Sequence, residues 1–139
     1  MRGDIRDHVE ARLAYTYWRF KFVEDSAFAG NEIPGAPTHH ASFELKYWHP
    51  SGVSIAPTFE MVPKSYFLDS RNTVRNDAWN TVGLRAEWVS QTAGLTAFVA
   101  GQNLTNRRYS ASVQVDNAAG NYYEPADARS FYAGLRWQR

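Results

Sequence analysis

The sequence predicts an all-β fold, an antiparallel up-and-down meander of about six strands whose two faces differ in polarity. Three observations support this prediction. Apolar and polar residues alternate over long stretches, as they do on half-buried strands. No stretch combines helix caps with an apolar period of about 3.6 residues. Aromatic residues reach 15% of the chain, with eight Tyr, eight Phe and five Trp, and these residue types favour strands.

The composition narrows the class of protein. The 139 residues are enough for one domain, and the lack of Cys excludes structural disulfides and thiolate metal sites. A net charge of +1 gives no argument for nucleic acid or for acidic substrates. No apolar run approaches the roughly 20 residues of a membrane helix, and the negative mean hydropathy is compatible with a membrane barrel, because half of each barrel strand is polar. Residues 1–7 lack the apolar core of a signal peptide, so we expect either a cytoplasmic protein or a piece of a longer chain.

The first half of the chain holds three predicted strands. The first runs from about Asp7 to Val23 and is long for a soluble strand. One of its faces carries Val9, Ala11, Leu13, Tyr15 and Tyr17, and the other carries Glu10, Arg12, Ala14, Thr16 and Trp18. The second strand is His39 to Trp48. The third is Val53 to about Val62, in which Pro57 indicates a bulge because proline cannot donate to the ladder.

The second half holds three more. The fourth strand, Trp79 to Val89, alternates most clearly. The fifth runs from Leu95 to about Val113, and its facing stays ambiguous because residues 97–100 are all apolar. The last strand is Ser130 to Trp137. Its apolar face carries Phe131, Ala133, Leu135 and Trp137, opposite Tyr132, Gly134 and Arg136.

The connections alternate in length along the chain. Long loops at Glu24–Thr38, Pro63–Ala78 and Gln114–Ala128 alternate with tight turns at His49–Gly52 and Ser90–Gly94. Transmembrane barrels of the outer-membrane type have this asymmetry, with short turns at one end and long loops at the other. Charged residues fall opposite the apolar rows; they are Glu10, Arg12, Glu44, Lys46, Glu60, Arg85, Glu87 and Arg136. They would line a wet lumen in a large barrel and face bulk water in a soluble sandwich.

Three motifs resemble a known family. Asn103-Leu104-Thr105-Asn106-Arg107-Arg108-Tyr109 resembles a box on a late strand of the C-terminal barrel of TonB-dependent outer-membrane receptors. Ala128-Arg129-Ser130-Phe131 resembles the start of the final strand of that barrel, and Ile33-Pro34-Gly35-Ala36-Pro37-Thr38-His39 resembles the beginning of an earlier strand. The motifs occur in the order of the family, and the resemblance covers nearly the whole chain.

The resemblance implies a function and a place. Residues 1–139 would be the C-terminal segment of a larger transmembrane β-barrel in the bacterial outer membrane, without the plug domain. The full receptor would import a metal chelate such as a ferric siderophore. The expected partners are outer-membrane lipid, the remaining strands and plug, and the chelate, with no nucleic acid. Because the plug is missing, we do not expect the segment to import ligand alone.

No catalytic constellation is present, so we expect no enzyme and no cofactor. His39 and His40 are adjacent on a strand and point to opposite faces, which favours a role at the start of a strand over a metal site. We expect Glu60 to join Arg85 or Glu87 in an ion-pair ladder. Several aromatic and polar residues of the long loops could contact a ligand, but we favour the interpretation that they shape and solvate the loops. They are Tyr66, Phe67, Asp69, Arg71, Asn72, Tyr122, Tyr123 and Glu124. No catalytic, cofactor-binding or metal-binding residue is assigned, and the substrate-binding residues stay unassigned.

Two expectations concern the alternatives. A small soluble β-barrel that binds an apolar ligand would place the aromatic rows inside and the charged rows outside. As a membrane segment, the six strands would form an open curved sheet, since a closed barrel of that size has little lumen. Its inward rows carry bulky or charged residues, namely Trp18, Trp48, Glu44, Lys46, Arg85 and Glu87. Its open edges would be the first strand, Asp7–Val23, and the last, Ser130–Trp137.

Overall fold

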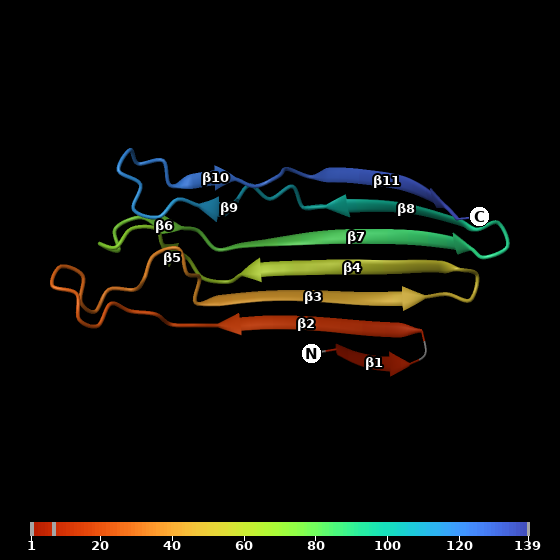
Figure 1. The fold of residues 1–139 in the computed structure, drawn as a ribbon, viewed down its shortest axis with the longest axis horizontal. Helices are drawn as coiled ribbons and strands as arrows, with labels where there is room; N and C mark the ends of the chain where they lie inside the picture. Colours follow the sequence, from red (N-terminus) through yellow and green to blue (C-terminus); the bar gives the residue numbers. More distant parts are fainter. Residues whose placement is uncertain (1, 7, 139) are drawn as a thin grey trace.

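A single antiparallel sheet forms most of the molecule (Figure 1). The computed structural model describes residues 2–6 and 8–138, with side chains from residue 8 onward. The sheet has seven strands in the order β1 (Arg2–Arg6), β2 (Val9–Tyr17), β3 (His39–Trp48), β4 (Val53–Val62), β7 (Trp79–Ser90), β8 (Leu95–Gln102) and β11 (Ser130–Trp137). Two short ribbons lie in the loops, β5 (Tyr66–Phe67) with β6 (Arg75–Asn76) and β9 (Ser110–Val113) with β10 (Tyr123–Pro125). No helix among the described residues is long and apolar enough to span a membrane.

The predicted fold class is confirmed, and the second and third predicted strands match β3 and β4 residue for residue. The tight turns lie at one end of the sheet and the long loops at the other (Figure 1). The bulge predicted at Pro57 is wrong. The register of β4 against β7 runs unbroken through the Pro57–Leu84 pair. Against β3, pairing resumes in the same register on both sides of the proline, so the missing N–H interrupts the ladder without shifting it.

Two strand boundaries were predicted too generously. The first strand ends at Tyr17, and beyond it the chain turns to its own loop: Phe22 N–H donates to the carbonyl of Asn31 and Ile33 N–H to that of Phe20. Asp7, where the strand was predicted to begin, lies outside the described residues. The fifth strand ends at Gln102, because Asn103 adopts a left-handed backbone with φ of 47° that a strand cannot continue.

The register sorts the side chains into two faces. The cross-strand row Arg12–Glu44–Thr58 lies on one face, and the row Leu13–Phe43–Phe59 lies on the other. All the charged strand residues predicted to share a face fall on the first, which is called the polar face here. Along β8, Phe98 pairs with Glu87 on the polar face and Val99 with Ala86 on the apolar face, which resolves the ambiguity of residues 97–100.

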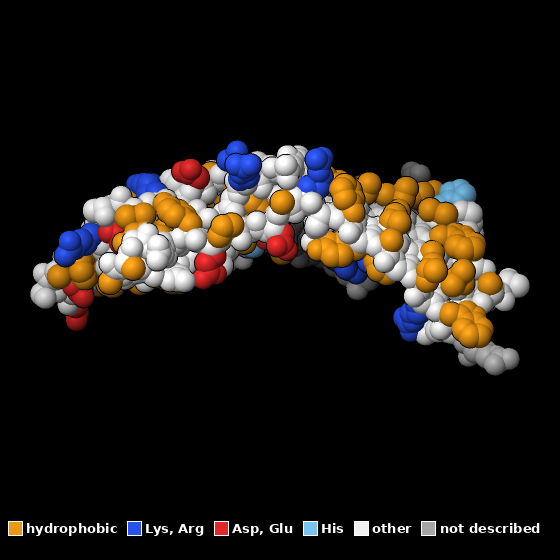
Figure 2. All heavy atoms as spheres, turned by 90° about the horizontal axis from the view of Figure 1, so that it is seen from above, with side chains coloured by type: hydrophobic (Ala, Val, Ile, Leu, Met, Phe, Trp, Pro, Cys, Tyr) orange, Lys and Arg blue, Asp and Glu red, His pale blue; other side chains and the backbone are white. Residues whose placement is uncertain are grey.

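The apolar face has no covering layer among the described residues. Side chains that a globular protein would bury are exposed there, with Leu135 77%, Phe131 71% and Trp137 67% accessible. The buried cluster of Val62, Tyr66 and Leu68 lies instead at the loop end. Seen from the β10 and β11 side, hydrophobic side chains gather over the half that holds the long strands, and the visible acidic side chains lie over the loop half (Figure 2).

The sheet stays open, because β1 and β11 stand at its two ends and do not pair with each other. The prediction that the Asp7–Val23 strand would be one open edge is wrong. β1 covers that edge, with pairs from Arg2–Arg12 to Arg6–Val9, so the open edges are β1 and β11.

We predict that the open edges make the isolated chain dependent on partners. Every second amide of β11 has no partner in the sheet, whereas β4 and β7 are bonded on both sides. In detergent, hydrogen exchange should be slow in β4 and β7 and fast at those β11 amides, and light scattering should show oligomers or heterogeneous mass. A monodisperse monomer with β1 and β11 fully protected would contradict this.

Candidate functional site

The polar face encloses a hollow of about 980 Å³ near the loop end. It is lined by the charged residues Arg12, Glu44, Glu60 and Asp127 and by polar residues that include Ser42, Thr58, Thr81 and Gln102. Charged and polar side chains make up much of its lining, as they would in the lumen of a large barrel.

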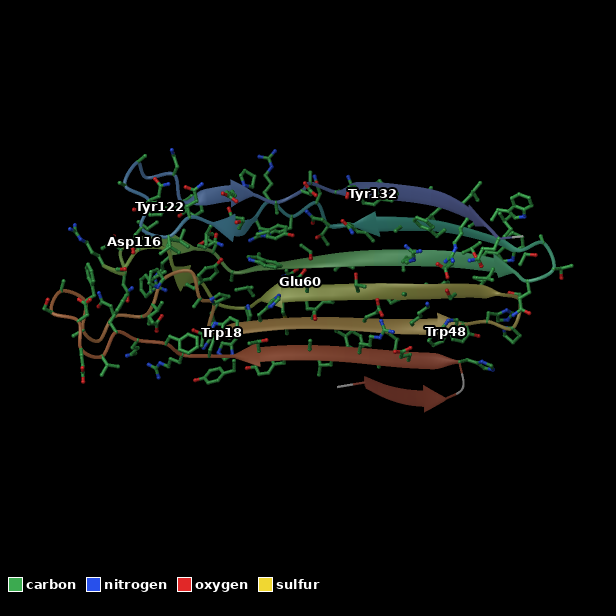
Figure 3. The ribbon with its side chains drawn as sticks, in the orientation of Figure 1. Trp18, Trp48, Glu60, Asp116, Tyr122 and Tyr132 are labelled. Atoms are coloured by element: carbon green, nitrogen blue, oxygen red, sulfur yellow. The ribbon has the colours of Figure 1, made fainter. Side chains whose placement is uncertain are left out.

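Ion pairs join most of the charged side chains of the polar face. Arg12 Nε lies 2.8 Å from Glu10 Oε1, Arg12 Nη1 lies 3.1 Å from Glu44 Oε1, and Arg85 Nη2 lies 2.9 Å from Glu87 Oε2. Glu60 was expected to pair with Arg85 or Glu87, and this is wrong. The register places Glu60 opposite Thr81, toward the loop end, and its carboxylate lies 2.9 Å from His40 Nε2 (Figure 3).

His39 and His40 point to opposite faces, as predicted. His40 turns inward to Glu60, while His39 Nδ1 lies 2.7 Å from the Tyr15 hydroxyl on the apolar face. The two rings therefore do not converge on one point. Within residues 2–6 and 8–138, no group of three His, Asp or Glu side chains is placed to hold a metal ion.

Asn103 organises the segment after β8. It is 6% exposed, its side-chain amide donates to the carbonyls of Arg107 and Asp127, and its side-chain oxygen accepts from Arg107 N–H. Leu104 N–H donates to the carbonyl of Val82, and Asn106 Oδ1 accepts from Arg129 N–H. The Asn103–Tyr109 box therefore ties the end of β8 to β7 and to the start of β11.

The three long loops are bound to one another. Asp116 accepts hydrogen bonds from the Ser70 amide at 2.7 Å and from the Ser70 hydroxyl at 2.6 Å (Figure 3). Asn31 Nδ2 donates to the carbonyl of Ser70, and the Asn72 side chain bonds both the amide and the carbonyl of Glu32. Beneath them Leu68 is fully buried. The loop end is thus a small folded unit of its own, which we call the loop cluster.

The loop residues singled out in the sequence mostly shape this cluster. Tyr66 is buried and bonds Asn76, and Tyr122 packs on the Leu68 core. Tyr123 donates to the carbonyl of Arg75, Arg75 stacks over Phe67, and Glu124 accepts from Gln114. Arg71 is exposed. Burial raises the pKa of the Asp69 carboxyl, but hydrogen bonds from the Val74 amide and from Thr73 outweigh it, and the net pKa lies below its ordinary value.

A second hollow of about 630 Å³ adjoins the first at the loop end. Both hollows are lined by Tyr109, Pro125, Ala126 and Ala128, and the second also by Arg75, Arg107 and Arg108. Sequence reasoning did not single out these arginines as a group, because Arg75 lies in a different loop from the other two. Tyr109 stacks on Trp79 with ring centroids 4.4 Å apart. Burial, and then the negative charges of Glu60 and Asp127, raise the pKa of its hydroxyl.

Comparison with known proteins identifies the family and the solved structures that this chain resembles. Residues 3–118 match the family model described as TonB dependent receptor-like, beta-barrel. The siderophore receptor PiuA from Acinetobacter baumannii superposes with a TM-score of 0.78 at 18% identity, over 96% of this chain and 20% of that chain. The ferric citrate transporter FecA superposes with a TM-score of 0.79 at 21% identity, over 93% of this chain and 20% of that chain. The ferric yersiniabactin uptake receptor FyuA from Yersinia pestis superposes with a TM-score of 0.77 at 17% identity, over 96% of this chain and 21% of that chain. The chain spans about a fifth of the length of these receptors, and the likeness shows a common fold.

We predict that Asn103→Ala destabilises the chain by about 2–4 kcal/mol. The substitution removes three hydrogen bonds of a buried amide and places Ala in a left-handed backbone conformation. The loss is measured as the fall in the denaturant midpoint of the detergent-refolded chain, with every variant at the same protein concentration. Asn80→Ala, at an exposed site on β7, is the matched control and should have little effect; equal losses for the two variants would contradict the assignment.

Proposed function

Because the chain belongs to the TonB-dependent receptor β-barrel family, we propose that it forms part of the wall of such a receptor in the bacterial outer membrane. The resemblance predicted from its motifs is confirmed. Members of this family are outer-membrane transport receptors and not enzymes. We propose that residues 1–139 are the C-terminal segment of the barrel, supported by the final-strand motif on β11 and by the order of the three motifs.

The observation that carries the proposal is the uncovered apolar face. Its tyrosines and tryptophans lie toward both ends of the strands, Tyr15 and Tyr17 near the loops and Tyr47, Trp88 and Trp137 near the tight turns. Aliphatic side chains such as Leu13 and Leu84 lie between them. Membrane barrels carry an apolar band flanked by two aromatic girdles, and this face has that arrangement.

The ligand we propose is a metal chelate such as a ferric siderophore. The names of the similar receptors support it, since they concern a siderophore, ferric citrate and ferric yersiniabactin. In the proposed receptor, this segment contributes inner wall and loops, and the remaining strands and plug complete the ligand path. Uptake should therefore need the whole receptor. Complementation of a receptor-deleted strain by this segment alone would overturn that part of the proposal.

The alternative, a small soluble β-barrel around an apolar ligand, requires the aromatic rows to be enclosed. In the structure Phe131, Leu135 and Trp137 are mainly exposed and no described layer encloses them. The facing of the rows therefore favours the membrane proposal.

A pair of neighbouring substitutions tests the proposal. Leu13 lies at the middle of β2 on the apolar face, in register with Phe43, and Ala14 beside it lies on the polar face, in register with Ser42. Leu13→Arg should lower the fraction of the chain that inserts into lipid vesicles, because a charge in the middle of the lipid face costs about 2–4 kcal/mol. Ala14→Arg should have little effect. The measurement is the fraction of refolded chain that floats with lipid vesicles, and equal effects of the two variants would contradict the membrane proposal.

A further inference from the structure

Two hollows of about 420 and 670 Å³ lie on the apolar face over β7, β8 and β11. Both are lined by Ala86, Val99 and Ala133, which form one cross-strand row in the register. The two hollows therefore meet along β8 and form one depression, which we call the apolar groove. It lies on the opposite face of the sheet from the hollow lined by Arg12 and Glu44.

The groove follows from an alternation of large and small side chains on this face. Its walls are large residues of the two flanking strands; they are Leu84 and Trp88 on β7 and Phe131 and Leu135 on β11. Its floor is made of smaller residues; they are Ala86, Ala97, Val99, Gly101 and Ala133. The strand β8 therefore forms a trough between β7 and β11.

The two ends of the groove differ. At the end nearer the loops, a Cβ built on Gly101 would come within 2.6 Å of Leu104 Cδ2 and 3.1 Å of the Phe131 ring, so these two side chains cover the floor there. This closed end lies beside Leu84, at the middle of β7. The other end reaches Trp88, close to the tight turn after β7. The groove therefore runs from the tight turns toward the middle of the sheet.

We propose that the apolar groove binds one acyl chain of a phospholipid from the membrane leaflet beside the tight turns. The inference rests on the proposed function and adds a specific lipid site to the wall. From Leu135 to Phe131 the groove is about 13 Å long at the rise of a β-strand, and one leaflet of the hydrocarbon core is about 15 Å thick. Trp88 at the open end is then at the level of the headgroups, where tryptophan is enriched in membrane proteins.

A chain in the groove makes contacts that lipid elsewhere on this face does not make. It touches both walls and the floor, whereas an empty groove would leave those side chains without partners on one side. The row Leu13–Phe43–Phe59 on β2, β3 and β4 has a large side chain at every position and offers no such floor. An acyl chain should therefore stay longer against β8 than against β3.

The test is photolabelling by phosphatidylethanolamine that carries a diazirine at the end of one acyl chain, as a trace component of phosphatidylethanolamine vesicles. Because the segment alone has open edges, residues 1–139 replace the matching segment of FecA, which closes the barrel. Adducts are assigned to residues by mass spectrometry. Labelling of Leu84 and Phe131 should be several-fold higher than labelling of the row Leu13–Phe43–Phe59, which lies one row away in the register and at a similar depth.

A matched pair of substitutions separates the groove from the face as a whole. Ala133→Phe fills the floor and should lower the labelling of Leu84 to the level of Phe43. Ala11→Phe adds the same ring to the same face on β2, outside the lining, and should leave the labelling of Leu84 unchanged. A general effect of the ring on insertion would appear in both variants.

Vesicle-inserted residues 1–139 are labelled in parallel. Since each adduct is assigned to a residue, oligomers of this chain allow the same comparison if the chimera does not assemble. Even labelling of the two rows, unchanged labelling in Ala133→Phe, or absence of label from the groove because a second copy covers it would overturn the inference. The flotation of Leu13→Arg and Ala14→Arg decides the membrane proposal separately, so a chain that floats but is labelled evenly contradicts the lipid site alone.

Discussion

The continuous antiparallel register from β2 to β11 is the constraint on which the rest of the structure depends. With a side-chain period of two, a slip of one residue would place Glu44 and Arg85 on the apolar face and Phe43 and Leu84 on the polar face. The turns hold this register. Gly52 has φ of 85°, and a Cβ there would collide with the carbonyl of Val89, so the β3–β4 turn fits against β7 only with glycine. At the other end, Asn103 fixes where β8 stops.

The loop cluster supplies the packing that the sheet lacks. The apolar side chains of the strands are exposed at the surface of the sheet. The fully buried Leu68 lies in a loop and not in the sheet. Hydrogen bonds between Asp116 and Ser70 and between Asn72 and Glu32 join loops that are far apart in sequence.

Local pattern predicted most of the sheet and little of the site. β3 and β4 alternate between flanking turn residues, so their bounds follow from the sequence. The first strand was predicted too long because Phe20 and Phe22 continue the pattern while bonding to their own loop. The end of β8 at Asn103 depends on hydrogen bonds to Arg107 and Asp127, which no alternation reveals. The pairing of Glu60 with His40 depends on strand register, and the hollow lined by Arg75, Arg107 and Arg108 depends on loop folding, because both bring distant residues together.

The central claim is that one face of this sheet meets lipid and the other meets water, and β7 allows the most direct measurement. The chain has no Cys, so single cysteines at positions 81–88 can each carry a spin label without interference. In vesicles, the labels at 82, 84, 86 and 88 should be accessible to oxygen dissolved in lipid, and those at 81, 83, 85 and 87 to a water-soluble nickel complex. Uniform accessibility along β7, or alternation with the opposite phase, would contradict the account.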